Sequence, residues 1–325
     1  EDERRIWIDW EDNKFGKRGF AQMIYYTNIG TIAPNNNYLV FTSDGTMVGQ
    51  LSSSFVSSLR NGDVFLLGGS TYRVSSIRGT RVNVSPATGY RPTIPSWTGE
   101  ANSRTHELSQ EVLELLEEVA TYARLEKDPM TIFTDILGLN RPVAHAVSGF
   151  FQEHVATTFQ VPSNDLILVE QVEAPLPTYI VTTCRGRAFN LALGHLFAGI
   201  ATNDNIIVHE LSFDENGFMI KLSHEVEISL IPEIFKQGNS KDVLQKHMME
   251  SQLFAKRFRE ISSRSMLNPR RIGAEEVSPK QFQQRAEQIM QKHRQMDDSV
   301  LIRETMNEIL HADLDMAQLE IFINR

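Results

Sequence analysis

Short stretches in which apolar and polar residues alternate fill the first hundred positions of the chain. The first of them, residues 5–10, places three large apolar side chains on one face, which is typical of a half-buried strand. The pairs Asp44-Gly45 and Asn61-Gly62 mark turns between later stretches. Strands are predicted at residues 5–10, 20–27, 38–42, 47–51, 64–67, 72–77 and 81–85. Short strands at this spacing indicate a small barrel or sandwich.

The pattern changes beyond residues 86–99, a stretch rich in Pro, Gly and Thr that is typical of a linker. Apolar residues recur at helical spacing over 108–123, with Thr105 as the expected N-cap, and again over 189–200. Further strands are predicted at residues 166–172, 179–183, 206–211 and 218–222. From residue 240 onward only helices are expected, one of them starting at Ser278-Pro279. The predicted fold is α+β: a small N-terminal β-barrel, then a mixed α/β domain with a helical C-terminal end.

Composition narrows the class of protein. A chain of 325 residues predicts two or more domains, and 41% hydrophobic with 22% charged residues is typical of a globular protein. No apolar run reaches the roughly 18–20 residues of a membrane-spanning helix, and no apolar segment follows residues 1–5, so no signal peptide is expected. The single cysteine excludes an internal disulfide and fits a reducing cytoplasm. A net charge of -9 argues against binding nucleic acid by bulk electrostatics, but local basic surfaces remain compatible with it.

Motifs of common enzymes are missing from the sequence. It contains no G-x-x-x-x-G-K-[ST] loop, no G-x-G-x-x-G turn, no H-E-x-x-H, no C-x-x-C and no G-x-S-x-G. A metal site built from Asp204, His209, Asp214 and Glu215 is one interpretation, and a solvated strand edge with an acidic turn is the favoured one. A reactive thiolate at Cys184 is likewise weighed against a small half-buried residue, which is favoured.

Basic residues at a predicted strand-to-helix junction form the first binding candidate. Arg185 and Arg187 stand beside the start of the 189–200 helix, with Asn190 one turn along. Free N–H groups and the positive end of the helix dipole favour a phosphate there. The alternative is structural, with Arg187 and Asn190 capping the helix or pairing with an acid, and the two interpretations are weighed equally.

Two further candidates are a basic segment and a set of aromatic side chains. Residues 256–294 carry more basic than acidic residues, and Lys256 and Arg264 are expected away from the buried face of their helix. The alternative is an ordinary solvated or docking face. Aromatic side chains on a β-rich domain can stack on single-stranded bases, although most such residues belong to a core. The aromatic candidates are Tyr25, Tyr26, Tyr72 and Trp97, with Trp97 in a loop and least core-like.

A series of short motifs also resembles one protein family. Residues 24–32 (IYYTNIGTI) resemble the start of the β-barrel module in large helicase-related (Lhr-type) superfamily 2 helicases. Later segments resemble the rest of that module and the DEAD/H-associated region that follows it: 49–51, 55–56, 59–69, 71–74, 91–100, 161–162, 169–170, 185–187, 190–193, 258–260, 264–265 and 284–285. The resemblance is ordered over nearly the whole chain and is nearest to the archaeal-type branch. The sequence departs from the family pattern at two places. Residues 33–37 stand where the family has a more acidic loop, and Arg185 stands where the family usually has an apolar or aromatic residue.

The resemblance implies an arrangement of domains and partners. Residues 1–19 would be the last strand of a winged helix, 20–104 the β-barrel module, and 105–325 the DEAD/H-associated domain. The family's RecA-like motor domains, with their ATP and Mg²⁺, would lie elsewhere, in cis or in another chain. The expected ligand is single-stranded DNA or RNA, or a duplex with a 3′ tail. The residues expected to bind it are Tyr26, Asn28, Tyr72, Arg73, Trp97, Arg185, Arg187, Asn190, Lys256 and Arg264.

Three functions remain distinct at this point. The first is an accessory region that grips the tracking strand of an ATP-dependent 3′-to-5′ translocase, with no ATPase motor and no cofactor in this chain. The second is a scaffold that docks partner proteins in a DNA repair or defence complex. The third is a free-standing hydrolase with a scattered site. Salt-dependent binding of single strands by the isolated chain separates the first from the second, and turnover is required for the third.

Overall fold

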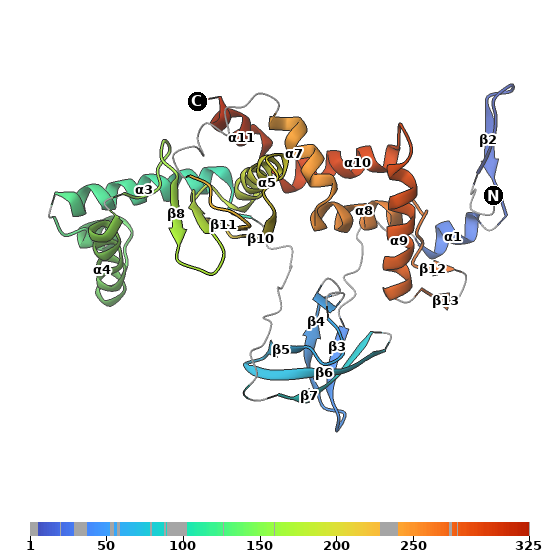
Figure 1. Ribbon diagram of the computed structural model, residues 1–325, viewed down its shortest axis with the longest axis horizontal. Coiled ribbons are helices and arrows are strands. Elements are labelled where there is room, and N and C mark those ends of the chain that lie inside the picture. Colours follow the sequence, from blue (N-terminus) through green and yellow to red (C-terminus); the bar gives the residue numbers. More distant parts are fainter. Residues whose placement is uncertain are drawn as a thin grey trace. The chain divides into compact units, whose positions relative to one another are not determined.

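The computed structural model shows a mixed α/β chain, as the sequence predicts (Figure 1). It describes residues 6–19, 21–28, 38–52, 55–56, 59–78, 80–87, 89, 103–125, 127–158, 160–227, 240–272, 275–277 and 279–324. Among these residues, no helix is long and apolar enough to cross a membrane. The chain folds into two compact units, each built from two segments: Glu1–Ala101 with Gln252–Thr305, and Asn102–Ser251 with Met306–Arg325.

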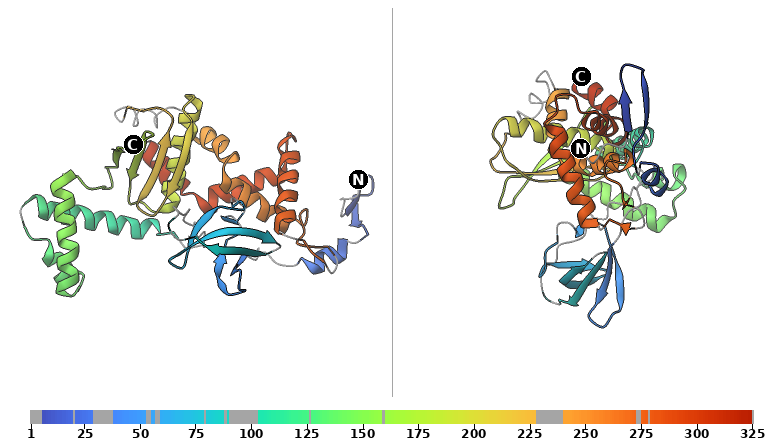
Figure 2. Two further views of the ribbon diagram at one scale, coloured as in Figure 1. Left: turned by 60° about the horizontal axis from the view of Figure 1, so that its bottom comes forward. Right: turned by 90° about the vertical axis from the view of Figure 1, so that its right-hand side faces the viewer.

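A five-stranded sheet forms much of the first unit (Figure 2). Its strands are β3 (Tyr38–Thr42), β4 (Met47–Leu51), β5 (Val64–Leu67), β6 (Ser70–Arg78) and β7 (Arg81–Pro86). Their order is β4-β3-β7-β6-β5, and β3 and β7 pair in parallel while the other neighbours are antiparallel. Alternate residues such as Val40, Phe65 and Val82 are fully buried in one core. The predicted hairpin at Asp44-Gly45 and the strands around it are confirmed.

The predicted closure of this sheet into a barrel is not confirmed. The outer strands are β4 and β5, and no pairing between them occurs in the described part of the chain. A closed barrel needs the first and last strands to share hydrogen bonds so that no edge remains. The structure therefore shows an open five-stranded sheet.

A hairpin and a short helix precede the sheet. Strands β1 (Ile6–Asp9) and β2 (Lys14–Lys17) pair as an antiparallel ribbon, which confirms a strand within residues 5–10. The strand predicted at residues 20–27 is wrong, because Ala21–Thr27 forms helix α1. The aromatic and β-branched residues there favour a strand by propensity, but Ile24 is buried and Asn28 fixes the end of the helix, so tertiary contacts override propensity.

Helices complete the first unit. They are α8 (Gln252–Arg264), α9 (Pro279–Arg294) and α10 (Val300–Glu308), and α10 carries the chain into the second unit. The prediction of helices alone beyond residue 240 is wrong in one detail, because β12 (Arg271–Ile272) and β13 (Glu275–Glu276) pair briefly. Two-residue strands are too short to produce a periodic pattern. Helix α9 begins at Pro279 as predicted, and its proposed N-cap Ser278 lies outside the described residues.

The second unit packs helices on a four-stranded antiparallel sheet. The sheet order is β10-β11-β9-β8, with strands β8 (Leu168–Val172), β9 (Thr178–Thr182), β10 (Val208–Phe213) and β11 (Gly217–Leu222). The helices are α3 (His106–Arg124), η1 (Ile132–Ile136), α4 (Arg141–Thr158), α5 (Arg187–Asn203), α7 (Ser240–Met249), η3 (Ile309–Asp313) and α11 (Met316–Ile323). The Thr105 hydroxyl accepts the N–H of Leu108, which confirms the predicted N-cap.

Helix α5 is the centre of the second unit. It is buried on nearly all sides and contacts β10, β11, α7 and α11. A Cβ at Gly194 would lie 2.5 Å from the Phe213 ring, so only glycine allows this approach of helix to strand. The middle of α5 therefore packs closely against β10 and β11.

Candidate nucleic-acid interface

Helix α1 presents two tyrosines to solvent. Tyr25 is 52% and Tyr26 is 63% exposed, and their rings meet edge to face with centroids 5.7 Å apart. Of the seven residues of this helix, only Ile24 is buried. Two exposed aromatic rings on one short helix offer flat faces on which single-stranded bases can stack.

The side-chain amide of Asn28 joins α1 to β12, a segment far away in the sequence. Figure 1 shows α1 and β12 side by side. Its Nδ2 donates to the carbonyl oxygens of Ile24, at 2.9 Å, and Arg271, at 3.0 Å. Its Oδ1 accepts the backbone N–H groups of Arg270, at 2.8 Å, and Arg271, at 3.1 Å. We call this set of hydrogen bonds the Asn28 clamp. A seven-residue helix is marginal by itself, so the clamp fixes where its tyrosines point.

The two arginines beside the clamp have different roles. The Arg270 guanidinium lies over the Phe282 ring at 5.0 Å, and that stacking holds the β12 segment against α9. Arg271 is exposed. The clamp thus joins the helix that carries an exposed aromatic pair to the strand that carries an exposed cation, and single-stranded nucleic acids bind such groups through bases and phosphates. The sequence does not indicate that Tyr25 and Arg271 belong to one site, because 246 positions separate them along the chain.

The residues of the five-stranded sheet that are expected to bind nucleic acid are less accessible than the tyrosines of α1. Tyr72 is half-buried and contacts the Phe65 ring at 6.4 Å, so its environment favours a core role. Arg73 is half-buried on β6 opposite Val64. Trp97 lies outside the described residues. Binding by these residues stays a prediction.

Helix α8 has the faces that its pattern predicts. Phe254, Phe258 and Ile261 are buried, whereas Lys256 is half-buried and Arg264 is exposed. Several neighbouring basic residues are engaged internally. The Arg257 guanidinium pairs with Glu260 at 2.8 Å, and the Arg294 guanidinium lies 5.9 Å over the Phe254 ring. The basic segment is therefore less cationic at its surface than its sequence indicates.

In the second unit, Arg187 and Asn190 bind the backbone of a turn. The Arg187 guanidinium donates to the Phe213 carbonyl at 2.7 Å. The Asn190 amide donates to the Asp214 carbonyl at 3.0 Å and bonds the Thr183 hydroxyl. Both contacts tie the start of α5 to the β10–β11 turn.

The N-terminus of α5 already holds an anion of the protein itself. The Glu215 carboxylate accepts the backbone N–H of Arg187 at 3.0 Å and that of Arg104 at 3.1 Å. A carboxylate at the first turn of a helix satisfies its free donors and its dipole. This geometry favours the structural role for Arg187 that the sequence left open, and the phosphate-binding role stays a prediction.

Arg185 is buried rather than presented to a ligand. It is 8% exposed and donates to the carbonyls of Ser163 and Asn164. Its guanidinium also lies over the rings of Phe189, at 5.4 Å, and Phe322, at 5.7 Å. The cation holds α5 and α11 together instead of facing solvent.

Arg104 is a second residue that sequence reasoning missed. Its guanidinium donates to the carbonyls of Cys184, at 2.8 Å, and Glu215, at 2.9 Å. Gly186 has a φ of 91°, and a Cβ there would lie 2.8 Å from the Arg104 carbonyl oxygen. Backbone packing at this turn thus explains the glycine of the R-G-R motif. That glycine was the one sign in the sequence that another segment packs closely here.

The metal and thiolate interpretations gain no support. In the described part of the chain, no group of three or more His, Cys, Asp or Glu side chains is placed to hold a metal ion. The Asp214 carboxylate instead accepts the N–H groups of Asn216 and Gly217 within the turn. Burial raises the pKa of the Cys184 thiol, which keeps it protonated.

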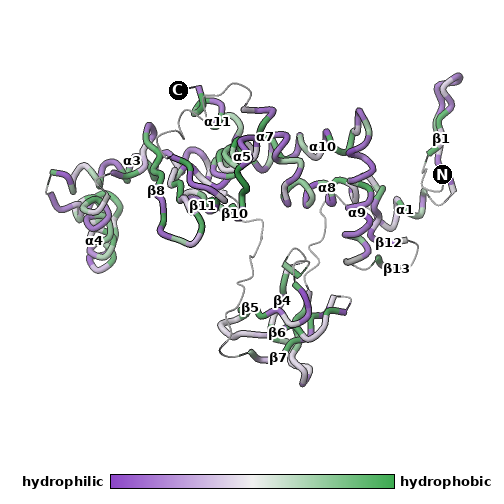
Figure 3. Tube along the Cα trace, viewed as in Figure 1, coloured by the Kyte–Doolittle hydropathy of each residue, from purple (hydrophilic) through white to green (hydrophobic). Residues whose placement is uncertain are grey.

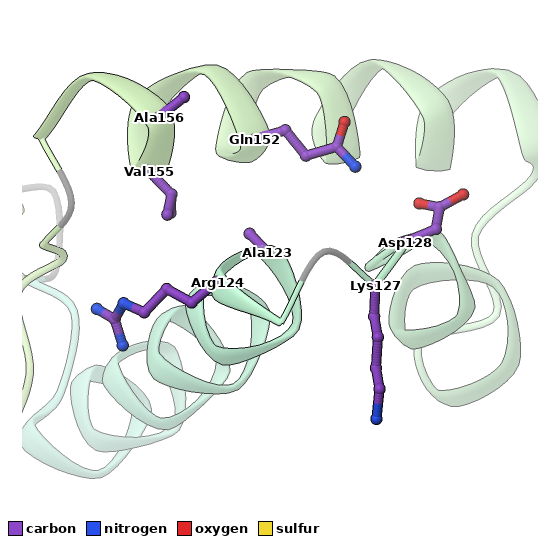
Figure 4. A pocket seen from close by; sticks show the side chains of 7 residues that line it. All are labelled: Ala123, Arg124, Lys127, Asp128, Gln152, Val155 and Ala156. Atoms are coloured by element: carbon purple, nitrogen blue, oxygen red, sulfur yellow. The ribbon is translucent and has the colours of Figure 1, made fainter.

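A pocket of about 630 Å³ lies between α3 and α4 (Figure 4). Its polar lining residues include Arg124, Lys127, Asp128 and Gln152. Figure 4 shows the side chains of Arg124 and Lys127 pointing in different directions, away from the space between the helices. These cations do not converge on one anion, so the pocket lacks the convergent polar groups of a ligand site.

Known proteins match the chain over almost its full length. A family profile described as DEAD/H associated matches residues 161–325, just over half of the chain, and one described as the winged helix domain of large helicase-related protein matches 2–94. The ATP-dependent helicase Lhr-Core protein 2 of Thermococcus barophilus is 30% identical over 98% of this chain. The chain belongs to the DEAD/H-associated family of Lhr-type helicases. This confirms the resemblance seen in the sequence.

Two more comparisons define the extent of the Lhr match. The ATP-dependent helicase Lhr-Core of Methanothermobacter thermautotrophicus is 30% identical over 96% of the chain, which spans 37% of each of these two relatives. A solved structure of Mycobacterium smegmatis helicase Lhr bound to ssDNA and AMP-PNP matches with a TM-score of 0.68 and 19% identity. It covers 98% of this chain and 37% of that one. At this identity the likeness shows the fold alone.

Proposed function

We propose that this chain is a nucleic-acid-binding accessory region of an ATP-dependent Lhr-type helicase, and that it grips the tracking strand during 3′-to-5′ translocation. One observation carries the proposal: the exposed Tyr25–Tyr26 pair, which the Asn28 clamp holds beside the exposed Arg271. Stacking of one base on an aromatic ring contributes about 1–3 kcal/mol and depends little on sequence. Such a grip suits a strand that must slide.

The comparisons support this proposal from outside the chain. Curated relatives bear the name ATP-dependent helicase, and the structural neighbour was solved with ssDNA and AMP-PNP. The sequence has no phosphate-binding loop, so RecA-like motor domains in cis or in another chain would bind ATP and Mg²⁺. We further propose that the open five-stranded sheet corresponds to the β-barrel module of the Lhr family, within the region that the winged-helix profile matches, and that residues 1–19 supply the last strand of the winged helix.

The test is direct binding by the 325-residue chain. Fluorescence anisotropy is measured with labelled single-stranded DNA, single-stranded RNA and a duplex with a 3′ tail, each at several salt concentrations. The proposal predicts binding of the single-stranded substrates that weakens linearly in log Kd against log salt. Absence of binding at 50 mM salt contradicts it.

A protein-interaction scaffold is the second candidate, because apolar side chains are exposed elsewhere. Ile136 (68%) and Phe150 (65%) are exposed in the second unit, and Trp10 (80%) and Phe15 (76%) on the β1–β2 hairpin. Exposed groups of large apolar residues are typical of protein interfaces. If the chain binds no nucleic acid, the scaffold function becomes the favoured one.

A further inference from the structure

Helix α9 buries one side and leaves the other open to solvent. Phe282, Ala286 and Met290 are buried at spacings of four residues, which defines the inner side. On the opposite side, Gln284 and Gln288 are exposed one turn apart, and Arg285 and Lys292 are exposed two turns apart. We call these four residues the outer face of α9. Figure 3 shows the helix as mostly hydrophilic.

The outer face contains no acidic residue, although the chain has 41 acidic residues. The only acidic residue of α9 is Glu287, and it is engaged beside this face. Its carboxylate accepts the Gln291 amide at 2.9 Å, and its charge acts on the half-buried Arg259 of α8, where burial lowers the pKa of the guanidinium. The charges within the outer face itself are the two positive charges of Arg285 and Lys292.

The chemistry of this surface fits a polyanion better than a protein. It offers amide donors and two cations, and large apolar or aromatic anchors, which dominate protein–protein binding, are missing from its four residues. The two cations lie seven residues apart, or about 10 Å along the helix. That spacing lets them contact different phosphates of one strand.

We propose that the outer face of α9 binds the sugar–phosphate backbone of nucleic acid through Arg285 and Lys292, with Gln284 and Gln288 donating to phosphate oxygens. This inference rests on the proposed function of the chain. It adds a backbone contact to the base-stacking contact at α1. Amide donors hold phosphates without strong Coulomb attraction, so the strand can advance past them.

The experiment compares two double variants of the full chain by anisotropy with single-stranded DNA and with blunt duplex. Arg285→Gln with Lys292→Gln removes both cations of the outer face. The matched control, Lys241→Gln with Lys246→Gln, removes two exposed cations from α7 in the other unit. Circular dichroism checks that both variants keep the helical content of the parent chain.

The slope of log Kd against log salt is expected to fall by roughly 1.5 in the α9 variant, since each lost phosphate contact removes about 0.7–0.9. The control should retain the parent slope. An equal change in both variants overturns the inference, because it then reflects net charge alone. If the α9 variant keeps the salt slope of the parent chain, the inference is also overturned. In that case the proposed function survives if Tyr26→Ala still weakens binding. Failure of the parent chain to bind either DNA overturns both proposals. A larger change with duplex than with single strands identifies the duplex backbone as the ligand.

Discussion

The side-chain amide of Asn28 bonds both the N–H and the C=O of Arg271, 243 residues away, and so joins α1 to β12. One planar group thereby connects the helix that carries an exposed aromatic pair to the strand that carries an exposed cation. In the proposed interface, Asn28 has a positioning role, and Tyr26 and Arg271 are the groups that would face a ligand.

Asn28→Ala is expected to release α1. The variant loses hydrogen bonds that together contribute about 1–3 kcal/mol, and it leaves backbone groups of residues 270–271 unpaired. Hydrogen exchange of the α1 amides should become much faster, and affinity for single strands should fall although the tyrosines are intact. Unchanged exchange in α1 contradicts the positioning role. Met23→Ala, which truncates an exposed side chain of the same helix, serves as the control.

Arg187→Ala is expected to reduce stability and leave the salt dependence of binding unchanged. The guanidinium bonds the Phe213 carbonyl, and a hydrogen bond to a charged group contributes about 1.5–3 kcal/mol. Urea unfolding measures the first effect and a salt titration measures the second. A salt slope reduced by about one, with stability retained, would restore Arg187 as a phosphate ligand.

The sequence predicts those parts of the fold that depend on neighbouring residues. Asp44-Gly45 identifies its hairpin because the turn needs a positive φ, and Gly45 has one. Thr105 identifies the start of α3 because the cap is three residues from its partner. The Asn28 clamp and the Glu215 contact at α5 join distant segments, so no local pattern indicates them. A helix N-terminus predicts a phosphate site at Arg187, but the sequence does not show that the Glu215 carboxylate already occupies this position.

Acidification is expected to destabilise the second unit through two histidines. His195 is 9% exposed and its ring lies 5.4 Å from that of His247 on α7. Burial, with a smaller effect of His247, lowers the pKa of His195 from 6.5 to about 4. The unfolded chain binds the proton more readily than the folded chain. The contribution of His195 to stability is therefore fully present above pH 6.5 and is lost as the pH falls toward 4.

The loss attributable to His195 is about 3 kcal/mol at most. Urea midpoints measured between pH 7.5 and 4.5 should fall less steeply in His195→Phe than in the parent chain. His145→Gln, at an exposed position of α4, is the control and should follow the parent. Parallel curves for His195→Phe and the parent contradict the assignment.

The isolated chain is expected not to bind ATP, because its sequence has no loop to hold the phosphates. Addition of ATP with Mg²⁺ should leave the melting temperature unchanged, since only a ligand of the folded state raises it. Stabilisation that increases with ATP concentration contradicts this expectation.

The most direct test of the central claim is the affinity of the Tyr26→Ala chain for single-stranded DNA, compared with Phe150→Ala. Both residues are large, exposed aromatics, at 63% and 65%, but only Tyr26 lies at the proposed interface. Loss of one stacked base should raise the Kd of Tyr26→Ala by roughly 5- to 150-fold at constant salt, with no change in melting temperature. Phe150→Ala should bind like the parent chain. Equal affinity of Tyr26→Ala and the parent chain would contradict the account.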